Sequence, residues 1–304
     1  MKLRVLITGG SGLLAVNWAM TIRSRCEVIL GIHDREIKLA GIKTKRVDLE
    51  SVANLMQELE ILQPDVVIHT AGLTNVERCE AAPELARHVN VKIVANVAKA
   101  CAKLNLAFVH ISSDHLFNGL VSFVEETHPI SPVNVYGSTK AEAEYQVLSL
   151  CQKALIIRTN FYGWGTSYRR SFSDMVIQEL RAGKELTLFK DVTYTPIIAE
   201  EVTKNVHDLI DLKASGIFHL VGDDMLSKYD FGLKLANEFN LNVNLIKSGC
   251  ISDRTSLIPR PHDMSLSNQK AKNFLGRNLG GVDEHIARLH QQEKNGFAQE
   301  LIKL

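Results

Sequence analysis

The chain has 304 residues, of which 45% are hydrophobic and 23% are charged, a balance typical of a folded globular protein rather than a disordered one. Lysine and arginine total 35 against 34 aspartate and glutamate residues, which gives a net charge of +1. No large electrostatic field is therefore available to attract nucleic acid or an anionic membrane. We expect neither as a partner, so any anionic ligand has to be bound locally.

The cysteines and the N-terminus bear on the cellular compartment. Five scattered cysteines without a C-x-x-C pair fit neither a disulfide framework nor a zinc site, so we expect reduced, mostly buried thiols. The first residues lead into a strand without the apolar stretch of a signal peptide, and no uncharged apolar run approaches the length that spans a bilayer. A cytoplasmic protein is the expectation.

Apolar strands and helical patterns alternate from the start of the chain. The predicted strands are 3–8, 27–32, 45–47, 65–69, 106–111 and 154–158, and the predicted helices are 13–24, 51–62, 83–104 and 136–151. Short strands that are apolar at nearly every position are covered on both faces, as in a parallel sheet. Right-handed crossovers make such a sheet doubly wound. The prediction is an α/β fold with a Rossmann-type parallel sheet.

The alternation weakens after about residue 161. Helical patterns cover 172–181, 199–212 and 228–239, a strand candidate lies at 217–221, and the polar tail from 291 fits a helix or a frayed end. We expect a dinucleotide-binding domain over residues 1–160. Residues 161–304 then form mainly a smaller α/β substrate-binding lobe, with room for some segments to return to the Rossmann sheet.

A glycine-rich turn, T-G-x-x-G-x-x-A over residues 8–15, joins the first predicted strand to the first helix. Glycine permits a positive φ and lets backbone amides approach a pyrophosphate at the positive end of a helix. Glycines also punctuate ordinary strand-to-helix turns, so the pattern gains weight from its place in a βαβ unit. We interpret it as a dinucleotide phosphate site that consists of Gly9, Ser11, Gly12, Leu13 and Leu14.

The second predicted strand is followed by His33, Asp34 and Arg35. An acidic side chain at this point binds the ribose hydroxyls of NAD, and a cationic one binds the extra phosphate of NADP. Because both occur, the cofactor is NAD or NADP with the preference open, and plain solvated loop charges are the alternative. Asp48, which precedes Leu49 after the third strand, is in position to accept a hydrogen bond from the adenine amino group.

A phenol and an ammonium group, Tyr136 and Lys140, stand four residues apart on one face of a predicted helix. A nearby cation favours the phenolate, so we expect Lys140 to lower the pKa of Tyr136. Taken alone, the pair is better explained as an exposed surface contact. However, the strand that ends at 111 is followed by Ser112 and Ser113, at the edge where doubly wound sheets bind ligands.

In this order and spacing, the glycine turn, the strand-end serine and Tyr-x-x-x-Lys resemble the extended short-chain dehydrogenases/reductases. Within them the chain is most similar to the dTDP-4-dehydrorhamnose reductase branch, whose S-T-D-Y-V-F-x-G stretch matches residues 112–119, with Ser113 in the place of the catalytic threonine. Further matches are P-x-N-x-Y-G at 132–137, Arg158 with Thr159, and R-P-x-x-x-x-L at 260–266. The resemblance covers nearly the whole chain.

The resemblance implies Ser113, Tyr136 and Lys140 as catalytic residues. It further implies cofactor contacts from Thr70, Ala71, Gly72, Asn90, Ser112, Tyr136 and Lys140, and substrate contacts from Thr74, Val76, Asp114, His115, Phe161 and Arg260. The chain departs from the branch at His115, Phe161 and Glu77, where the branch has tyrosine, tryptophan and aspartate, which leaves the sugar open. No metal site is expected, because the strand histidines His69, His110, His115 and His219 lack partners at ligand spacing.

The implied activity is NAD(P)H-dependent reduction of a keto group on a nucleotide-linked deoxysugar. In it Tyr136 donates the proton, Ser113 holds the substrate oxygen, and Lys140 tunes the phenol and binds the cofactor ribose. One alternative is a nucleotide-sugar epimerase or dehydratase, which uses the same pair for a transient oxidation. The expected partner is a nucleotide-sugar substrate, and a homodimer is common in this family, although the sequence gives no test of it.

A second alternative is a non-catalytic regulatory subunit like that of methionine adenosyltransferase. That relative is also matched by Gly216, Phe218, His219, Gly222, Lys228, Tyr229 and Phe239.

Overall fold

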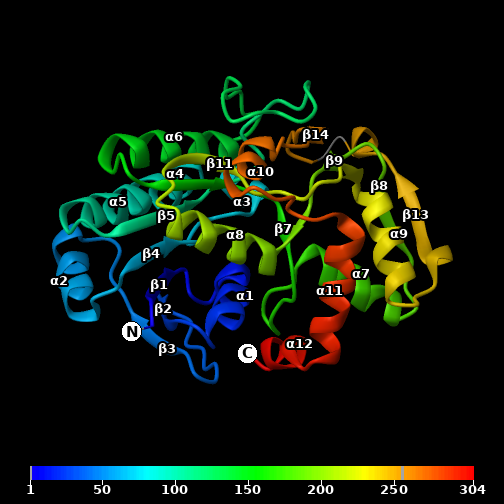
Figure 1. Ribbon diagram of the computed structural model, residues 1–304. Coiled ribbons are helices and arrows are strands. Elements are labelled where there is room, and N and C mark those ends of the chain that lie inside the picture. Colours follow the sequence, from blue (N-terminus) through cyan, green and yellow to red (C-terminus); the bar gives the residue numbers. More distant parts are fainter. Residues whose placement is uncertain (1, 255–256) are drawn as a thin grey trace.

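A parallel sheet organises the protein in a computed structural model that describes residues 2–254 and 257–304 (Figure 1). Its strands are arranged in the order β11-β6-β5-β4-β1-β2-β3. Their bounds are β1 Arg4–Thr8, β2 Glu27–Ile32, β3 Lys43–Arg46, β4 Val66–His69, β5 Ala107–Ile111, β6 Leu155–Arg158 and β11 Gly216–His219. The order reverses between β1 and β4, so a ligand crevice is expected at their carboxyl ends. The predicted Rossmann-type fold is confirmed.

Helices cover both faces of the sheet (Figure 1). On one face lie α2 Val52–Leu62, α5 Ile93–Lys103 and α6 Val135–Leu150, and on the other lie α1 Leu13–Ile22 and α8 Ala199–Asp211. Side chains alternate along each strand, so one strand serves two cores. Leu6 packs toward α2 and α5, whereas its neighbours Val5 and Ile7 pack toward α1.

The second half of the chain adds small sheets of two or three short strands, and helices, at one side of the main sheet (Figure 1). Its strands are β7 Phe161–Tyr162, β8 Leu186–Phe189, β9 Thr193–Tyr194, β10 Ile197–Ile198, β12 Leu226–Ser227, β13 Ile246–Gly249 and β14 Asp263–Met264. Its helices are α7 Phe172–Arg181, α9 Lys228–Glu238, η2 Val243–Leu245, η3 Ile251–Asp253, α10 Gln269–Leu275, α11 Val282–Lys294 and α12 Phe297–Ile302. Strand β11 leaves this region and pairs with β6 in the main sheet.

Two details differ from the sequence prediction. The predicted helix 83–104 is interrupted: α3 Val76–Ala81 precedes it, and α4 Pro83–Arg87 continues into a π-helical turn, η1 His88–Lys92, before α5 begins. The third strand begins at Lys43 rather than 45. This start could not be predicted from the sequence, because the strand is an exposed edge strand without an apolar pattern. For the polar tail, the structure agrees with the first of the two predicted alternatives, a helix, because Ala298 and Leu301 of α12 are buried.

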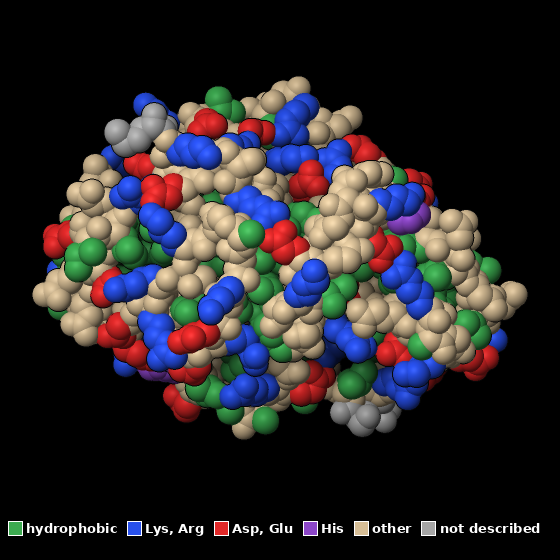
Figure 2. All heavy atoms as spheres, turned by 90° about the horizontal axis from the view of Figure 1, so that it is seen from below, with side chains coloured by type: hydrophobic (Ala, Val, Ile, Leu, Met, Phe, Trp, Pro, Cys, Tyr) green, Lys and Arg blue, Asp and Glu red, His purple; other side chains and the backbone are tan. Residues whose placement is uncertain are grey.

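The surface carries charges of both signs. Figure 2 shows basic and acidic side chains interspersed over the face seen from below. Within the described residues no helix combines the length and the apolar character needed to cross a membrane. All five cysteines are free thiols, and four of them are buried.

A buried ion pair fixes α6 to the sheet. Arg158 at the end of β6 donates to both carboxylate oxygens of Glu144, with Nη2 at 2.7 Å from Oε2, and the two side chains are only 1% and 2% exposed. The Nη1 atom of Arg158 also lies 3.3 Å from Nε2 of His219. Removing one partner would leave the other charge buried without compensation.

We predict that Arg158→Met lowers the free energy of unfolding by about 3–5 kcal/mol, the usual cost of breaking a buried pair. The control is Arg181→Met, which breaks a two-bond pair with Glu293 on the surface, and it should cost at most about 1 kcal/mol. Urea denaturation of both variants measures the difference. Equal, small losses would show that the Glu144 carboxylate finds other compensation.

Candidate active site

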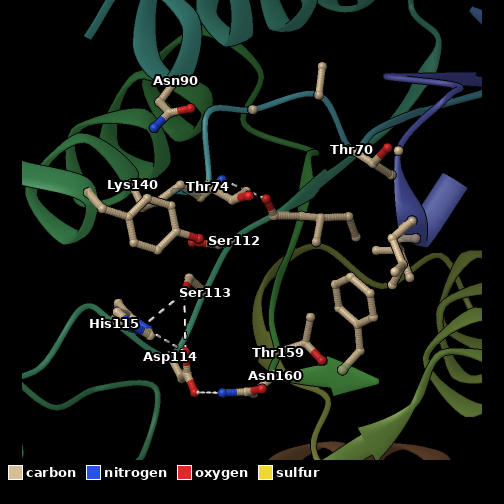
Figure 3. Close-up of a pocket in the computed structure, with 18 of the residues that line it drawn as sticks. Thr70, Thr74, Asn90, Ser112, Ser113, Asp114, His115, Lys140, Thr159 and Asn160 are labelled. Carbon is tan, nitrogen blue, oxygen red and sulfur yellow. Dashed lines mark hydrogen bonds and ion pairs between the residues drawn. The ribbon is translucent and has the colours of Figure 1, made fainter. Parts of the chain in front are cut away.

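A cavity of about 270 Å³ opens at the carboxyl ends of β1, β4, β5 and β6 (Figure 3). Its walls come from the turn after β1, the loops after β4, β5 and β6, and the first turns of α6. The lining residues are Gly12, Leu13, Leu14, Thr70, Ala71, Gly72, Thr74, Val76, Asn90, Ile111, Ser112, Ser113, Asp114, His115, Tyr136, Lys140, Thr159, Asn160, Phe161 and Arg169.

The glycine turn has the shape of a phosphate cradle. Gly9 has a φ of +71°, and a Cβ atom at this position would lie 2.6 Å from the backbone nitrogen of Ala71. The N-cap of α1 is Gly12, which offers no side chain to its first amides. A helix end of this kind attracts anions through its free N–H groups and the helix dipole. The turn therefore fits the pyrophosphate of a dinucleotide.

The start of α6 is pressed against the loop after β5. Asn134 caps the helix by accepting a hydrogen bond from Gly137 N at 2.9 Å. A Cβ atom on Gly137 would lie 2.3 Å from the carbonyl oxygen of His115, so only glycine permits this approach. The contact brings Tyr136, in the first turn of α6, edge-on to the His115 ring with 5.4 Å between ring centroids.

Tyr136 is buried, with 8% of its surface exposed, and the sequence prediction about its acidity is wrong. Burial raises the pKa of Tyr136 to about 12, and a hydrogen bond with Ser113 opposes this rise only in part. The predicted lowering by Lys140 does not occur, because the Lys140 ammonium is bonded elsewhere. The phenol is therefore protonated at neutral pH, the state that a proton donor requires.

The ammonium group of Lys140 points at the end of β5. It donates to the carbonyl oxygen of Ile111 at 2.7 Å and lies 3.3 Å from Nε2 of His110. Burial lowers the pKa of Lys140 to about 8, against the opposing effect of Glu144. Lys140 is thus charged at neutral pH and close to its titration range.

Ser113, Asp114, His115 and Asn160 form a hydrogen-bonded cluster at one end of the cavity (Figure 3). The Ser113 hydroxyl donates to Asp114 Oδ1 at 3.2 Å, and Nδ1 of His115 lies 2.9 Å from the same oxygen. Asn160 donates to the other carboxylate oxygen. Burial opposes ionisation of Asp114, but the hydrogen bonds from His115 and Asn160 hold its pKa below the usual range. The cluster therefore presents a carboxylate.

Asn90 joins three elements behind the cavity. Its Oδ1 accepts from Leu73 N at 2.7 Å, and its Nδ2 donates to Leu73 O and to Thr139 Oγ1 of α6, both at 3.0 Å. Asn90 lies in the π-helical turn η1, a local rearrangement that often occurs at functional sites. Because its amide is saturated by protein groups, Asn90 supports the loop after β4 and α6 from behind.

Most of the predicted site residues line this one cavity. Among the others, Gly9 and Ser11 belong to the turn itself, while His33, Asp34 and Asp48 line a separate hollow beyond β2 and β3. Leu49 packs against the core under α5. Arg260 does not line the cavity but forms an ion pair with Glu77.

Arg35 occupies a distinctive place. Its guanidinium lies 4.0 Å from the centroid of the Tyr168 ring, and the Tyr168 hydroxyl donates to Ser11 O at 3.0 Å. The cation is thereby held beside the glycine turn.

Sequence reasoning missed Ile111, Thr159, Asn160 and Arg169 as lining residues. Thr159 and Asn160 could have been found, because they directly follow β6, whose carboxyl end lies at the same edge as those of β4 and β5. Arg169 had no local signal. It reaches the cavity from the loop before α7, where Nη2 donates to Thr74 Oγ1 at 2.9 Å. In residues 2–254 and 257–304, no group of three or more His, Cys, Asp or Glu side chains is placed to hold a metal ion.

Comparisons with known proteins give matches over nearly the whole chain. The family model described as RmlD substrate binding domain matches residues 2–294. A probable low-salt glycan biosynthesis reductase, Agl14 of Haloferax volcanii, is 30% identical over 287 residues, which cover 93% of this chain and 96% of that relative. A dTDP-4-dehydrorhamnose reductase of Aggregatibacter actinomycetemcomitans is 27% identical over 283 residues, with 90% and 93% covered.

Two further similarities differ in kind. The methionine adenosyltransferase 2 subunit beta of Rattus norvegicus is 28% identical over 246 residues, which cover 78% of this chain and 72% of that protein. The crystal structure of dTDP-4-dehydrorhamnose reductase from Bacillus anthracis in complex with NADP has a TM-score of 0.82 and 23% identity, covering 96% of this chain and 100% of that one. At 23% identity, the similarity to the Bacillus anthracis structure shows a shared fold only.

We predict that Gly9→Ala abolishes detectable dinucleotide binding, because the added methyl group meets the Ala71 backbone and the positive φ strains alanine. The control is Gly183→Ala, where φ is +70° but a Cβ atom would meet nothing within 4 Å. This variant carries the same backbone strain and should bind NADPH like the wild type in a fluorescence titration. Normal binding by Gly9→Ala would separate the turn from the cofactor site.

Proposed function

The chain belongs to the RmlD substrate binding domain family, a branch of the extended short-chain dehydrogenases/reductases, and we propose that it reduces a keto group on a nucleotide-linked deoxysugar. As a member of this family it is an NAD(P)-dependent oxidoreductase. One observation carries the proposal: Ser113, Tyr136 and Lys140 line the same cavity as Gly12 and Leu13 of the phosphate-binding turn. A phenol, a hydroxyl and an ammonium group thus surround the space in front of the cofactor site.

The three side chains have separable roles in this reaction. A bound NAD(P)H supplies the hydride for the keto carbon. Tyr136 donates its proton to the substrate oxygen, which its burial and its pKa of about 12 favour at neutral pH. Ser113 holds that oxygen by a hydrogen bond, while Lys140 would bind the cofactor ribose.

The loops around the cavity supply groups suited to the remainder of the substrate. The Asp114 carboxylate and the Asn160 amide can hold sugar hydroxyls, because both lie at the cavity wall next to Ser113. Arg169 is an exposed cation that lines the cavity, which suits it to binding a diphosphate. Thr74, Val76, His115 and Phe161 complete the proposed substrate contacts, and Arg260 lies outside this wall.

The preference between the two cofactors follows from Arg35. Its guanidinium is stacked on Tyr168 beside the glycine turn, and this location suits the extra phosphate on the adenosine ribose of NADP. Asp34 is engaged with His33, which lies at 2.9 Å in an exposed pair. We therefore propose NADPH as the preferred cofactor.

The similarity to the methionine adenosyltransferase 2 subunit beta supports a second candidate, a regulatory subunit of this fold. The two functions make opposite predictions. A reductase consumes NADPH with a keto sugar in the absence of any partner. A regulator forms a stoichiometric complex with a synthetase subunit and changes the synthetase activity instead.

We predict that the purified protein oxidises NADPH in the presence of a 4-keto nucleotide sugar from a panel of such substrates. Tyr136→Phe should lower kcat by about 10²–10⁴-fold, the usual worth of a positioned proton donor, while NADPH binding is kept. The control is Tyr145→Phe, which removes a hydroxyl from the same helix at a side chain that is 72% exposed. Absorbance at 340 nm and product mass measure the result.

The possible outcomes separate the candidate functions. Full activity of Tyr136→Phe would remove the phenol from the mechanism. Conversion of the sugar without net NADPH loss would identify an epimerase or dehydratase, whose cofactor is regenerated. No turnover of any sugar together with a stable synthetase complex would establish the regulatory function.

We also predict that Arg35→Ala lowers the ratio of kcat/KM with NADPH to that with NADH by about 10- to 100-fold, because charge-assisted contacts to the phosphate are lost. Arg46→Ala is the comparison, since that cation lies on the neighbouring edge strand and is already paired with Glu36 at 3.4 Å. It should change the ratio much less. If Arg46→Ala alone changes the ratio, the phosphate is bound from the edge strand instead.

A further inference from the structure

A row of buried polar side chains crosses the sheet beneath the cavity. Thr8 and His69 are the last residues of β1 and β4, and His110 is the last but one of β5, with Thr8 in register with His69 and His69 with His110. All three are fully buried. Thr8 Oγ1 lies 2.7 Å from His69 Nδ1, and the two imidazole rings are stacked with 5.8 Å between centroids. The row ends at the ammonium of Lys140.

His110 differs from its neighbours in the row because it faces the ammonium directly. Nε2 of His110 is 3.3 Å from Lys140 Nζ, and it is one of two acceptors there, with Ile111 O as the other. To accept a hydrogen bond from an ammonium group, this nitrogen has to carry a lone pair, which places the proton of a neutral ring on Nδ1. Burial, reinforced by Lys140 and His69, lowers the pKa of His110 well below its ordinary value and keeps the ring neutral.

The arrangement carries a cost that packing alone does not explain. Nδ1 of His110 and Nε2 of His69 have no hydrogen-bond partner among the described residues. A buried nitrogen without a hydrogen-bond partner destabilises the fold, so its presence calls for an explanation other than stability. Two residues earlier, on the same face of the sheet, β4 carries Val67 and β5 carries Phe108, which are both apolar. An apolar residue at 110 would fill the space without the unpaired nitrogen.

We propose that His110 is a positioning residue that holds the Lys140 ammonium in its charged form and in its place beside the cofactor site. This inference rests on the proposed function, because it assigns His110 a role through Lys140. With Ile111 O and His110 Nε2 as acceptors, two N–H groups of the ammonium point toward the sheet. The third is left for the cavity that Lys140 lines, in position for the ribose of the cofactor.

The charged and titratable groups that face Lys140 come from four elements. They are Glu144 on α6, His110 on β5, His69 on β4 and Arg158 on β6, which is paired with Glu144. The Glu144 carboxylate favours the ammonium, and the neutral imidazole of His110 favours it by accepting a hydrogen bond. Because burial has already lowered the pKa of Lys140 to about 8, losing an acceptor lowers this pKa further. Activity that needs the charged form is then lost at a lower pH.

The test is the pH dependence of kcat/KM between about pH 6 and 10, which reports groups of the free enzyme. His110→Phe keeps a ring but removes the acceptor. In His110→Phe, the alkaline limb of the profile, where kcat/KM is lost, should begin about one pH unit lower than in the wild type. Relative to the wild type, kcat/KM should then be about tenfold lower at pH 9 and less than about twofold lower at pH 6. His110→Gln, whose amide oxygen can accept, should restore the wild-type limb.

His219→Phe is the matched control. Nε2 of His219 also lies 3.3 Å from a buried cation, that of Arg158, and the ring is likewise fully buried. Neither His219 nor Arg158 lines the cavity. Arginine also does not titrate between about pH 6 and 10. This variant should lose stability and keep the wild-type pH profile. If its limb moves as far as that of His110→Phe, or if the limb of His110→Phe does not move, His110 has only a packing role.

Two additions keep the test decisive. If His110→Phe does not fold, His110→Leu removes the same acceptor with a smaller side chain, and the same comparison applies. If the wild type reduces no sugar, the proposed reduction fails. His110 is then tested by the pH dependence of NADPH affinity, measured by fluorescence in the same four proteins. A limb for NADPH binding that is identical in His110→Phe and the wild type overturns the inference independently of any substrate.

Discussion

A buried ammonium group is the most demanding element of the site. Lys140 is only 6% exposed, and a charge in such a place is tolerated only where acceptors and a counter-charge replace water. The acceptors come from the end of β5, and the counter-charge comes from Glu144, one helical turn further along α6. Glu144 is in turn bound to Arg158 of β6. The position of α6 on the sheet is therefore set by charges as much as by its apolar face.

This constraint explains how the phenol comes to face the cavity. Once Lys140 and Glu144 fix α6 over β5 and β6, the first turn of the helix has to lie against the loop after β5. Gly137 permits that contact at the carbonyl of His115. Tyr136 is then buried between the helix and the loop, where its proton is retained. The same burial that raises its pKa thus keeps the phenol protonated, which is the state that the proposed reduction requires.

Sequence reasoning found the fold and the main parts of the site because both depend on local patterns. Strand and helix periodicity gave the parallel sheet, and the glycine turn and Tyr-x-x-x-Lys gave two walls of the cavity. What could not be predicted depends on contacts between distant segments. Arg169 reaches Thr74 across the cavity, and the row from Thr8 to His110 exists only because register aligns three strands. The acidity of Tyr136 was misjudged for the same reason, since burial is a tertiary property.

The chemistry and the choice of substrate are separable in this architecture. Lys140 lines the cavity on its sheet side, with His110 and the Glu144–Arg158 pair behind it. Asp114, His115 and Asn160 lie at its wall and are tied to one another. His115 links the two sets, because its carbonyl contacts Gly137, its ring contacts Tyr136 and its Nδ1 contacts Asp114. A histidine in place of the tyrosine of the branch leaves the contact with α6 intact, because that contact is made by the backbone. It changes the hydrogen bonding of the Asp114 carboxylate, which lines the cavity. Under the proposed reduction, the departure at His115 therefore concerns how the substrate is held rather than the proton donor.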